Sequence, residues 1–300
     1  MNLEEFSNAV LAAVKDKAEG DFRARMITIT KNNGIKMTGI VSVVPGSKGG
    51  PCIYLDSYYE EYRKGRTEIS EVIGKVCRQL MEHKDDLRDF SMDSLCHWDV
   101  VKTRIYVKLV NREMNTGLLG AVPHRQFLDL SAVYYIKLEG KGGIPTILIY
   151  NEHMLMWGKD EEELYQTAMK NMRLEGEALF EDMDMVFKRM MPEHADFLAD
   201  SGASQVSMYV LSNRSKFFGA AEILDSNTLK SIGNRLGEDF VILPSSVHET
   251  IIIPSSKAPE YSELADQVRE VNEEDVEIGE RLSNHVYLYS RNEGTLKIVA

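Results

Sequence analysis

The side chains best suited to chemistry lie in one short run, PSSVHE, at residues 244–249, which holds Ser245, Ser246, His248 and Glu249. A serine nucleophile needs a base within hydrogen-bonding reach and a third group that orients the base. Ser246 and His248 lie on neighbouring positions of a strand connection, however, where their side chains need not converge, and no GxSxG motif accompanies them. The run is compatible with catalysis, with contact to a small ligand or partner, and with a turn that satisfies its own backbone.

Two further pairs of polar residues are candidates for binding. His124 and Arg125 place an imidazole beside a guanidinium, and together these groups could recognise a carboxylate or a phosphate. A structural ion pair between Arg125 and Asp129 explains the same residues. Asn213 and Arg214, in the segment MYVLSNRSKFFGAAEIL, complete the set of predicted binding residues.

The sequence contains no motif for a metal or a nucleotide cofactor. The glycine-rich run PGSKGGP, residues 45–51, does not match GxxxxGK followed by Ser or Thr, and GxGxxG is absent. HExxH and CxxC are also absent, and the seven histidines are scattered singly. We therefore expect no metal site and no cofactor.

Cysteine content and the N-terminal segment bear on the compartment. Three cysteines, Cys52, Cys77 and Cys96, are an odd number without CxxC spacing, which favours a reducing environment over a disulfide framework. The first residues, MNLEEFSNAV, carry acids where a signal peptide needs a basic region, and no run reaches the roughly 18 apolar residues of a membrane span. These features predict a cytoplasmic protein that makes no membrane contact.

The chain is acidic, with 35 Lys and Arg against 47 Asp and Glu and a formal net charge of -12. Such a surface repels phosphate backbones unless basic groups gather locally, and no basic cluster stands out. Direct nucleic-acid binding is accordingly disfavoured. Acids lined up on one exposed face would instead suit a mimic of nucleic acid or an inhibitor of another protein.

Helical and strand patterns alternate along the chain without a regular βαβ period. This arrangement predicts an α+β fold with mixed or antiparallel sheets flanked by helices. We expect an N-terminal lobe over residues 1–192 that ends in methionine-rich helices, a linker over residues 193–205, and a C-terminal lobe over residues 206–300. Expected helices include one that opens the chain at residue 3 and ends near residue 20, and those at residues 68–83 and 261–271. Expected strands include residues 22–30, 35–44, 105–110, 131–138, 144–150, 208–211, 240–243, 250–253, 286–290 and 296–299.

Six segments carry a resemblance to a known family: NNGIKMTGI, IYLDSYYEEYRKGR, VPHRQFLDLSAVYY, NEHMLMWG, MYVLSNRSKFFGAAEIL and LPSSVHETIIIP. Together they resemble the domain of unknown function 5688 family, found mainly in anaerobic gut Firmicutes, over residues 3–291. The stretch from Tyr209 to the turn at Pro244 also resembles the domain of unknown function 1444 family. Neither resemblance implies an activity, a cofactor or a partner.

Two functional hypotheses from different classes remain. The favoured one is a non-enzymatic cytoplasmic binding or regulatory protein that contacts a macromolecular partner through the methionine-rich helices or the 244–249 run, at a groove between the lobes. The alternative is a hydrolase or transferase acting on a small acidic substrate. In that case His248 is the base, Ser246 or Glu249 supports it, and His124 or Arg125 lies opposite.

Overall fold

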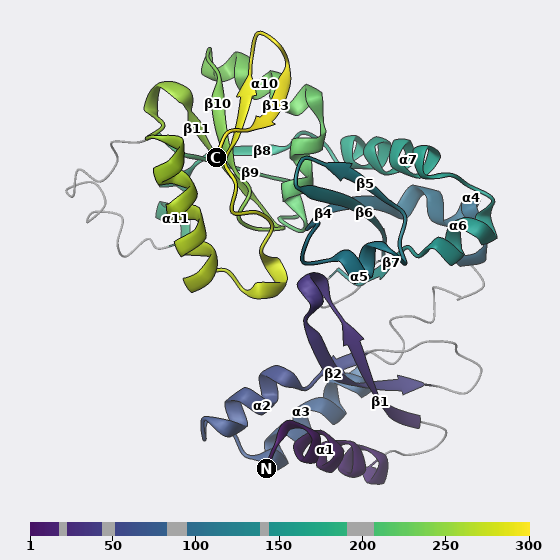
Figure 1. Cartoon of the computed structure of the whole chain (residues 1–300). Helices are drawn as coiled ribbons and strands as arrows, with labels where there is room; N and C mark the ends of the chain where they lie inside the picture. The colour runs from purple at the N-terminus through teal and green to yellow at the C-terminus, as the bar shows by residue number, and fades with distance from the viewer. Residues whose placement is uncertain (18–22, 44–51, 83–94, 139–143, 191–206) are drawn as a thin grey trace. The chain divides into compact units, whose positions relative to one another are not determined.

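The computed structural model describes residues 1–17, 23–43, 52–82, 95–138, 144–190 and 207–300. The chain forms two compact units (Figure 1). The first comprises residues 1–102 with 138–145, and the second comprises residues 103–137 with 146–300.

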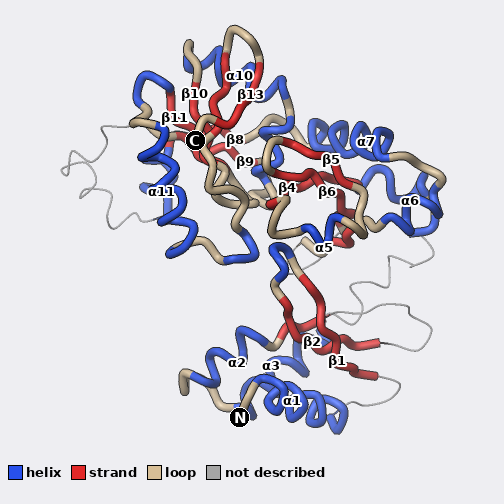
Figure 2. The backbone as a smooth tube through the Cα atoms, viewed as in Figure 1, coloured by secondary structure: helices blue, strands red, loops and turns tan. Residues whose placement is uncertain are grey.

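The first unit is a β-hairpin with helices packed beside it (Figure 2). Its turn is Asn32–Gly34, where Asn33 and Gly34 have φ values of 57° and 73°, as expected for residues that tolerate the left-handed region. The core joins Phe6 and Val10 of the first helix to Val72 and Val76 of a later one, because these apolar residues recur on one helical face. The elements are α1 (Leu3–Lys17), β1 (Arg23–Thr30), β2 (Lys36–Val43), β3 (Cys52–Tyr54), α2 (Asp56–Arg63), α3 (Ile69–Glu82) and α4 (Trp98–Val101), with an antiparallel sheet in the order β1-β2-β3.

The second unit begins with a four-stranded antiparallel sheet. Its central strand, β6 (Leu130–Lys137), is buried at every position except Lys137, because other strands pair with it along both edges. Asn171 of helix α7 (Glu161–Leu174) donates to the carbonyl of Ile105 in β4 (Ile105–Asn111) at 2.8 Å and so ties the helix to the sheet. The elements are β4 (Ile105–Asn111), α5 (Thr116–Leu119), β5 (His124–Phe127), β6 (Leu130–Lys137), β7 (Thr146–Leu148), α6 (Asn151–Trp157) and α7 (Glu161–Leu174).

The rest of this unit is a six-stranded antiparallel sheet in the order β13-β12-β10-β11-β9-β8. Val241 and Ile253 of its inner strands pack against Leu264 and Ala265 of the C-terminal helix. The elements are β8 (Leu179–Asp182), α8 (Met183–Met190), β9 (Tyr209–Ser212), the 3₁₀ helix η5 (Gly219–Leu224), α10 (Ser226–Leu236), β10 (Phe240–Leu243), β11 (Thr250–Pro254), η6 (Ser255–Lys257), α11 (Tyr261–Glu274), η7 (Ile278–Glu280), β12 (Tyr287–Ser290) and β13 (Thr295–Ile298).

The α+β class with antiparallel sheets is confirmed. The predicted linker at residues 193–205 lies outside the described residues. An N-terminal lobe that ended at residue 192 would place β8 and β9 in different lobes. In the structure these two strands pair with each other, from Leu179 with Ser212 to Asp182 with Tyr209. Main-chain pairing between segments far apart in sequence thus draws the methionine-rich α8 into the second unit.

Among the helices that the structure describes, none combines the length and the apolar character needed to cross a bilayer.

Candidate functional site

The Ser246 hydroxyl is turned toward the backbone of its own segment. Its Oγ accepts a hydrogen bond from the backbone N–H of His248 at 3.1 Å, and the side chain is buried. Serine commonly makes this local bond in turns. An isolated β-bridge between Ser246 and Arg281, with the Leu282 N–H donating to the Ser245 carbonyl at 3.0 Å, holds the segment from its other side.

The His248 imidazole has partners other than Ser246. Its Nδ1 accepts from the backbone N–H of Phe218 at 3.2 Å, which assigns the ring proton to Nε2. Nε2 lies 3.5 Å from Glu280 Oε1, and the ring stacks on Phe218 with an interplanar angle of 5°. Glu249 is half-buried, and burial raises the pKa of its carboxyl. The described contacts therefore do not join serine and histidine into a nucleophile and base.

Arg125 is engaged by two acids at the start of α7. Its Nε and Nη2 donate to Glu161 at 3.1 and 2.7 Å, its Nη2 also contacts Glu162, and the guanidinium lies 4.0 Å from the ring centre of Tyr165. These carboxylates raise the pKa of Arg125 above its usual value. Arg125 thus forms a structural ion pair, with Glu161 in place of Asp129. The exposed His124 directs its Nδ1 to the Val122 carbonyl at 3.1 Å.

Asn213 closes a local loop. Its Oδ1 accepts from the Phe217 N–H at 3.1 Å and from the Ser215 hydroxyl at 3.1 Å, while its Nδ2 donates to the Phe217 carbonyl at 2.8 Å. Arg214 is exposed and lies against Gly176, where a Cβ atom would approach the arginine Nε to 2.9 Å. These contacts assign Asn213 to loop geometry and leave Arg214 at the surface.

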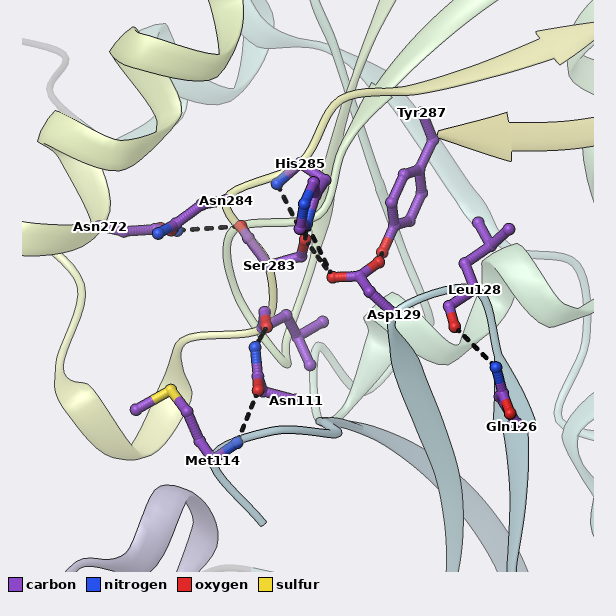
Figure 3. A network of polar contacts seen from close by, with 11 residues as sticks. Asn111, Met114, Gln126, Leu128, Asp129, Asn272, Ser283, Asn284, His285 and Tyr287 are labelled. Carbon is purple, nitrogen blue, oxygen red and sulfur yellow. Dashed lines mark hydrogen bonds and ion pairs between the residues drawn. The ribbon is translucent and has the colours of Figure 1, made fainter. Parts of the chain in front are cut away.

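A polar network that sequence spacing did not predict centres on Asp129 (Figure 3); Ser283 and Tyr287 are buried, Asp129 is partly buried and His285 is exposed. The Ser283 hydroxyl donates to Asp129 Oδ2 at 2.7 Å, His285 Nδ1 lies 3.1 Å from the same oxygen, and the Tyr287 hydroxyl donates to Oδ1. Burial first, and then the Asp129 charge, raise the pKa of the Tyr287 phenol. Asp129 and Ser283 are 154 residues apart, so no local pattern could have revealed the network.

The composition of this network is that of a hydrolase triad, but its geometry is not. Ser283 Oγ and Asp129 Oδ2 both approach His285 Nδ1, at 3.2 and 3.1 Å, whereas a triad uses the two ring nitrogens for the two partners. Ser283 is also only 2% exposed. Asn111 donates to the Leu282 carbonyl at 2.6 Å beside it. The network therefore fastens the segment before β12 to the strand ends of the four-stranded sheet.

Helix α6 presents apolar side chains to solvent. Its inner side is anchored by Met154 and Trp157, which are buried, and the His153 ring stacks on Trp157 with ring centres 5.6 Å apart. Leu155 is 83% exposed and Met156 is also exposed. Glu152 lies one helical turn before them, so these three residues share one side of the helix, which we call the α6 face. A cavity of about 440 Å³ adjoins it, lined by Ala121, Tyr150, Asn151 and Glu152.

A second pocket, of about 520 Å³, lies in the second unit between the end of α7, the start of β8, η5 and α10. Glu222 of η5 lines it and is only 5% exposed. Burial, and then the charges of Asp225 and Glu175, raise the pKa of the Glu222 carboxyl to about 8. A buried acid that titrates near neutrality in a pocket is a recognised mark of a functional position.

Two other charged residues of this pocket, Asp225 and Arg173, are paired with each other. Asp225 accepts from Arg173 Nε and Nη2 at 3.0 and 3.1 Å and also caps α10 through the Asn227 N–H at 3.1 Å. Within the described ranges, no group of three or more His, Cys, Asp or Glu side chains is arranged to hold a metal ion.

No curated protein matches the chain, and no solved structure matches it. A family model does match, that of the family of unknown function DUF5688, over residues 3–291. This span covers nearly the whole chain and agrees with the extent of the six resembling segments. The chain therefore belongs to the family of unknown function DUF5688.

Proposed function

We propose that this chain is a non-enzymatic cytoplasmic binding protein that contacts a macromolecular partner through the α6 face. The observation that carries the proposal is the 83% exposure of Leu155 on a helix whose opposite side is anchored by buried Met154 and Trp157. A large apolar side chain held on a rigid helix contributes more to binding than one on a mobile loop, because less entropy is lost on association. Met156 beside it supplies an adaptable contact.

Two local features support a protein as the partner. The cavity lined by Tyr150 and Glu152 adjoins the α6 face and has room for an anchoring side chain. The helix start is fixed, because the Asn151 N–H donates to the Ala121 carbonyl at 3.0 Å and the Tyr150 N–H donates to His153 Nδ1 at 2.9 Å. A partner segment with an apolar residue and a nearby basic group would complement the leucine, the methionine and the Glu152 carboxylate. The net charge of -12 argues against a nucleic acid in this role.

The enzymatic alternative has less support. It requires His248 to act as a base toward Ser246, yet the serine hydroxyl accepts from the backbone N–H and the imidazole Nδ1 accepts from Phe218. A hydrolase or transferase built on the 244–249 run would need both bonds to break and the side chains to turn toward one another.

The test is affinity capture with the full chain in a lysate of its own source, comparing variants side by side. A stoichiometric partner should be retained by the wild type, by Val271→Lys and by His248→Ala, and should lose about tenfold or more in affinity with Leu155→Lys/Met156→Lys. Val271 is a matched control because it is an exposed apolar residue on another helix, α11.

Two results would overturn the proposal. One is a partner that binds the Leu155→Lys/Met156→Lys variant as tightly as the wild type. The other is a bound molecule that is lost only with His248→Ala, because this would move the site to the 244–249 run.

A further inference from the structure

The pocket beside α10 contains an acid without a partner. No described residue gives the Glu222 carboxyl a hydrogen bond or an ion pair, although the residue is 95% shielded from solvent, since its exposed fraction is 5%. A buried carboxyl without a partner is costly, because burial removes its water and nothing replaces those hydrogen bonds. A buried group without a partner requires an explanation, and a ligand that supplies the missing contacts is one.

The two cations that line the pocket, and the one paired with Glu175, are engaged by other groups. Arg173 donates two hydrogen bonds to Asp225. Lys137 is paired with Glu175, one of the acids that act on Glu222. Arg235 lies over the Phe180 ring, 5.0 Å from its centre, and donates to the Phe180 carbonyl at 3.4 Å. Only burial and two acids act on the pKa of Glu222, and no cation among the described residues lowers it, so the position opposite this carboxyl is open to a cation from outside.

The rest of the pocket indicates the form of that cation. Phe180, Leu211 and Ile232 provide an apolar wall, and Asn227, Thr228 and Ser231 provide polar groups at the start of α10. An anion in the pocket would face the carboxylates of Glu177 and Asp225 as well as Glu222. The backbone N–H of Asn227 at the start of α10 could otherwise bind an anion, but it already donates to Asp225. The lining thus suits a positive group attached to a small carbon skeleton.

We propose that this pocket binds a small organic cation, an amine or an amidine whose N–H groups donate to the Glu222 carboxylate while its carbon skeleton lies against Phe180 and Ile232. The site belongs to a different part of the second unit from the α6 face, and it does not depend on the function proposed above.

Binding to this site is coupled to a proton. The charged groups that line the pocket or act on Glu222 are Asp225, Glu175, Glu177, Arg173 and Arg235. The pKa of about 8 means that the empty site is mostly protonated at pH 7. A cation requires the carboxylate, so it must displace this proton. Affinity should rise about tenfold for each pH unit between pH 6 and pH 7.5 and level off above pH 8.

The experiment is a titration of the full chain with benzamidine hydrochloride, followed by ligand-observed NMR at pH 6, 7 and 9. Butylamine hydrochloride is a second cationic probe, and benzamide and benzoate are the neutral and anionic controls. The wild type and Glu263→Gln, which changes an exposed acid on α11, should bind benzamidine more tightly at pH 9 than at pH 6. Glu222→Gln should abolish binding of both cations.

Three outcomes would overturn the proposal. They are no binding of either cation to the wild type, tighter binding of benzoate than of benzamidine, and equal binding of benzamidine by the wild type and Glu222→Gln. Should Glu222→Gln fail to fold, the pH dependence of the wild type still decides, because a cation site at this carboxyl must weaken toward pH 6. Glu222→Asp then serves as the folded variant, with weakened binding expected because its carboxylate is one methylene further back.

Discussion

Replacing Asp129 by alanine removes the acceptor on which the polar network depends. Three groups converge on this carboxylate, namely the hydroxyls of Ser283 and Tyr287 and Nδ1 of His285 (Figure 3). Ser283 and His285 lie 3.2 Å apart and can bond to each other once the carboxylate is gone. The Tyr287 hydroxyl is fully buried, and once the carboxylate is gone its described neighbour is the Ser283 side chain, which His285 also approaches. Asp129→Ala therefore removes the charged acceptor of a buried donor and leaves Tyr287 and His285 to share one hydroxyl.

The expected cost follows from these contacts. A hydrogen bond to a charged group contributes about 1.5–3 kcal/mol, and Asp129 accepts two such bonds from the hydroxyls of Ser283 and Tyr287. The contributions are not additive, because two of the three partners can rearrange. We expect Asp129→Ala to lower the free energy of unfolding of the second unit by roughly 3–5 kcal/mol.

Urea denaturation followed by tryptophan fluorescence measures this change. The chain has two tryptophans, Trp98 in the first unit and Trp157 in the second. In a Trp98→Phe background the signal comes from Trp157 alone, so the transition reports on the unit that contains the network. Far-UV circular dichroism of the same variants checks that the fold is retained before urea is added.

A double-mutant cycle with Tyr287→Phe isolates the central contact. If Asp129 and Tyr287 are coupled as described, the double variant should lose less stability than the sum of the single variants, by at least about 1 kcal/mol. The reasoning is refuted if Asp129→Ala costs less than about 1 kcal/mol, which is below the contribution of one hydrogen bond to a charged group. Strict additivity of the two substitutions would refute it as well.

Two further predictions concern packing and protonation. Gly219→Ala should destabilise the second unit by more than about 2 kcal/mol, because the new Cβ would lie 2.6 Å from the backbone N of Asn213 and 2.6 Å from the His248 carbonyl oxygen. Gly117→Ala is the control, since a Cβ there would have no atom within 4 Å. Equal thermal stability of the two variants would contradict the prediction. The pKa of Glu222 is about 8, above its usual value of 4.5, so between these pH values the folded chain binds more protons than the unfolded chain. The free energy of unfolding of the wild type should therefore fall as the pH rises from 5 to 8, by at most about 5 kcal/mol. Urea unfolding of Glu222→Gln should lack this fall, and a pH dependence equal to that of the wild type would contradict the prediction.

Local patterns predicted much of the secondary structure. The Asn32-Asn33-Gly34 turn led to the expected hairpin of β1 and β2, because Asn and Gly tolerate positive φ. The helical repeat of Phe6, Val10 and Val14 correctly identified the buried side of α1. Long-range pairing was harder to anticipate. Neither the union of β8 with β9 nor the division of the chain near Lys102 follows from any local run of residues.

For the candidate functional residues, too, the sequence predicted the residue types and the structure supplied their partners. The sequence by itself determined the acidic charge, the α+β class, the membership in the DUF5688 family and the reactive residue types at 244–249. Only the tertiary structure decided which side chains meet: Arg125 with Glu161, Asp129 with Ser283, and Glu222 with a pocket instead of a partner. The physical reason is that residue type fixes the chemistry a side chain can perform, whereas burial and neighbours, which set its pKa and its hydrogen bonds, come from segments far apart in the chain.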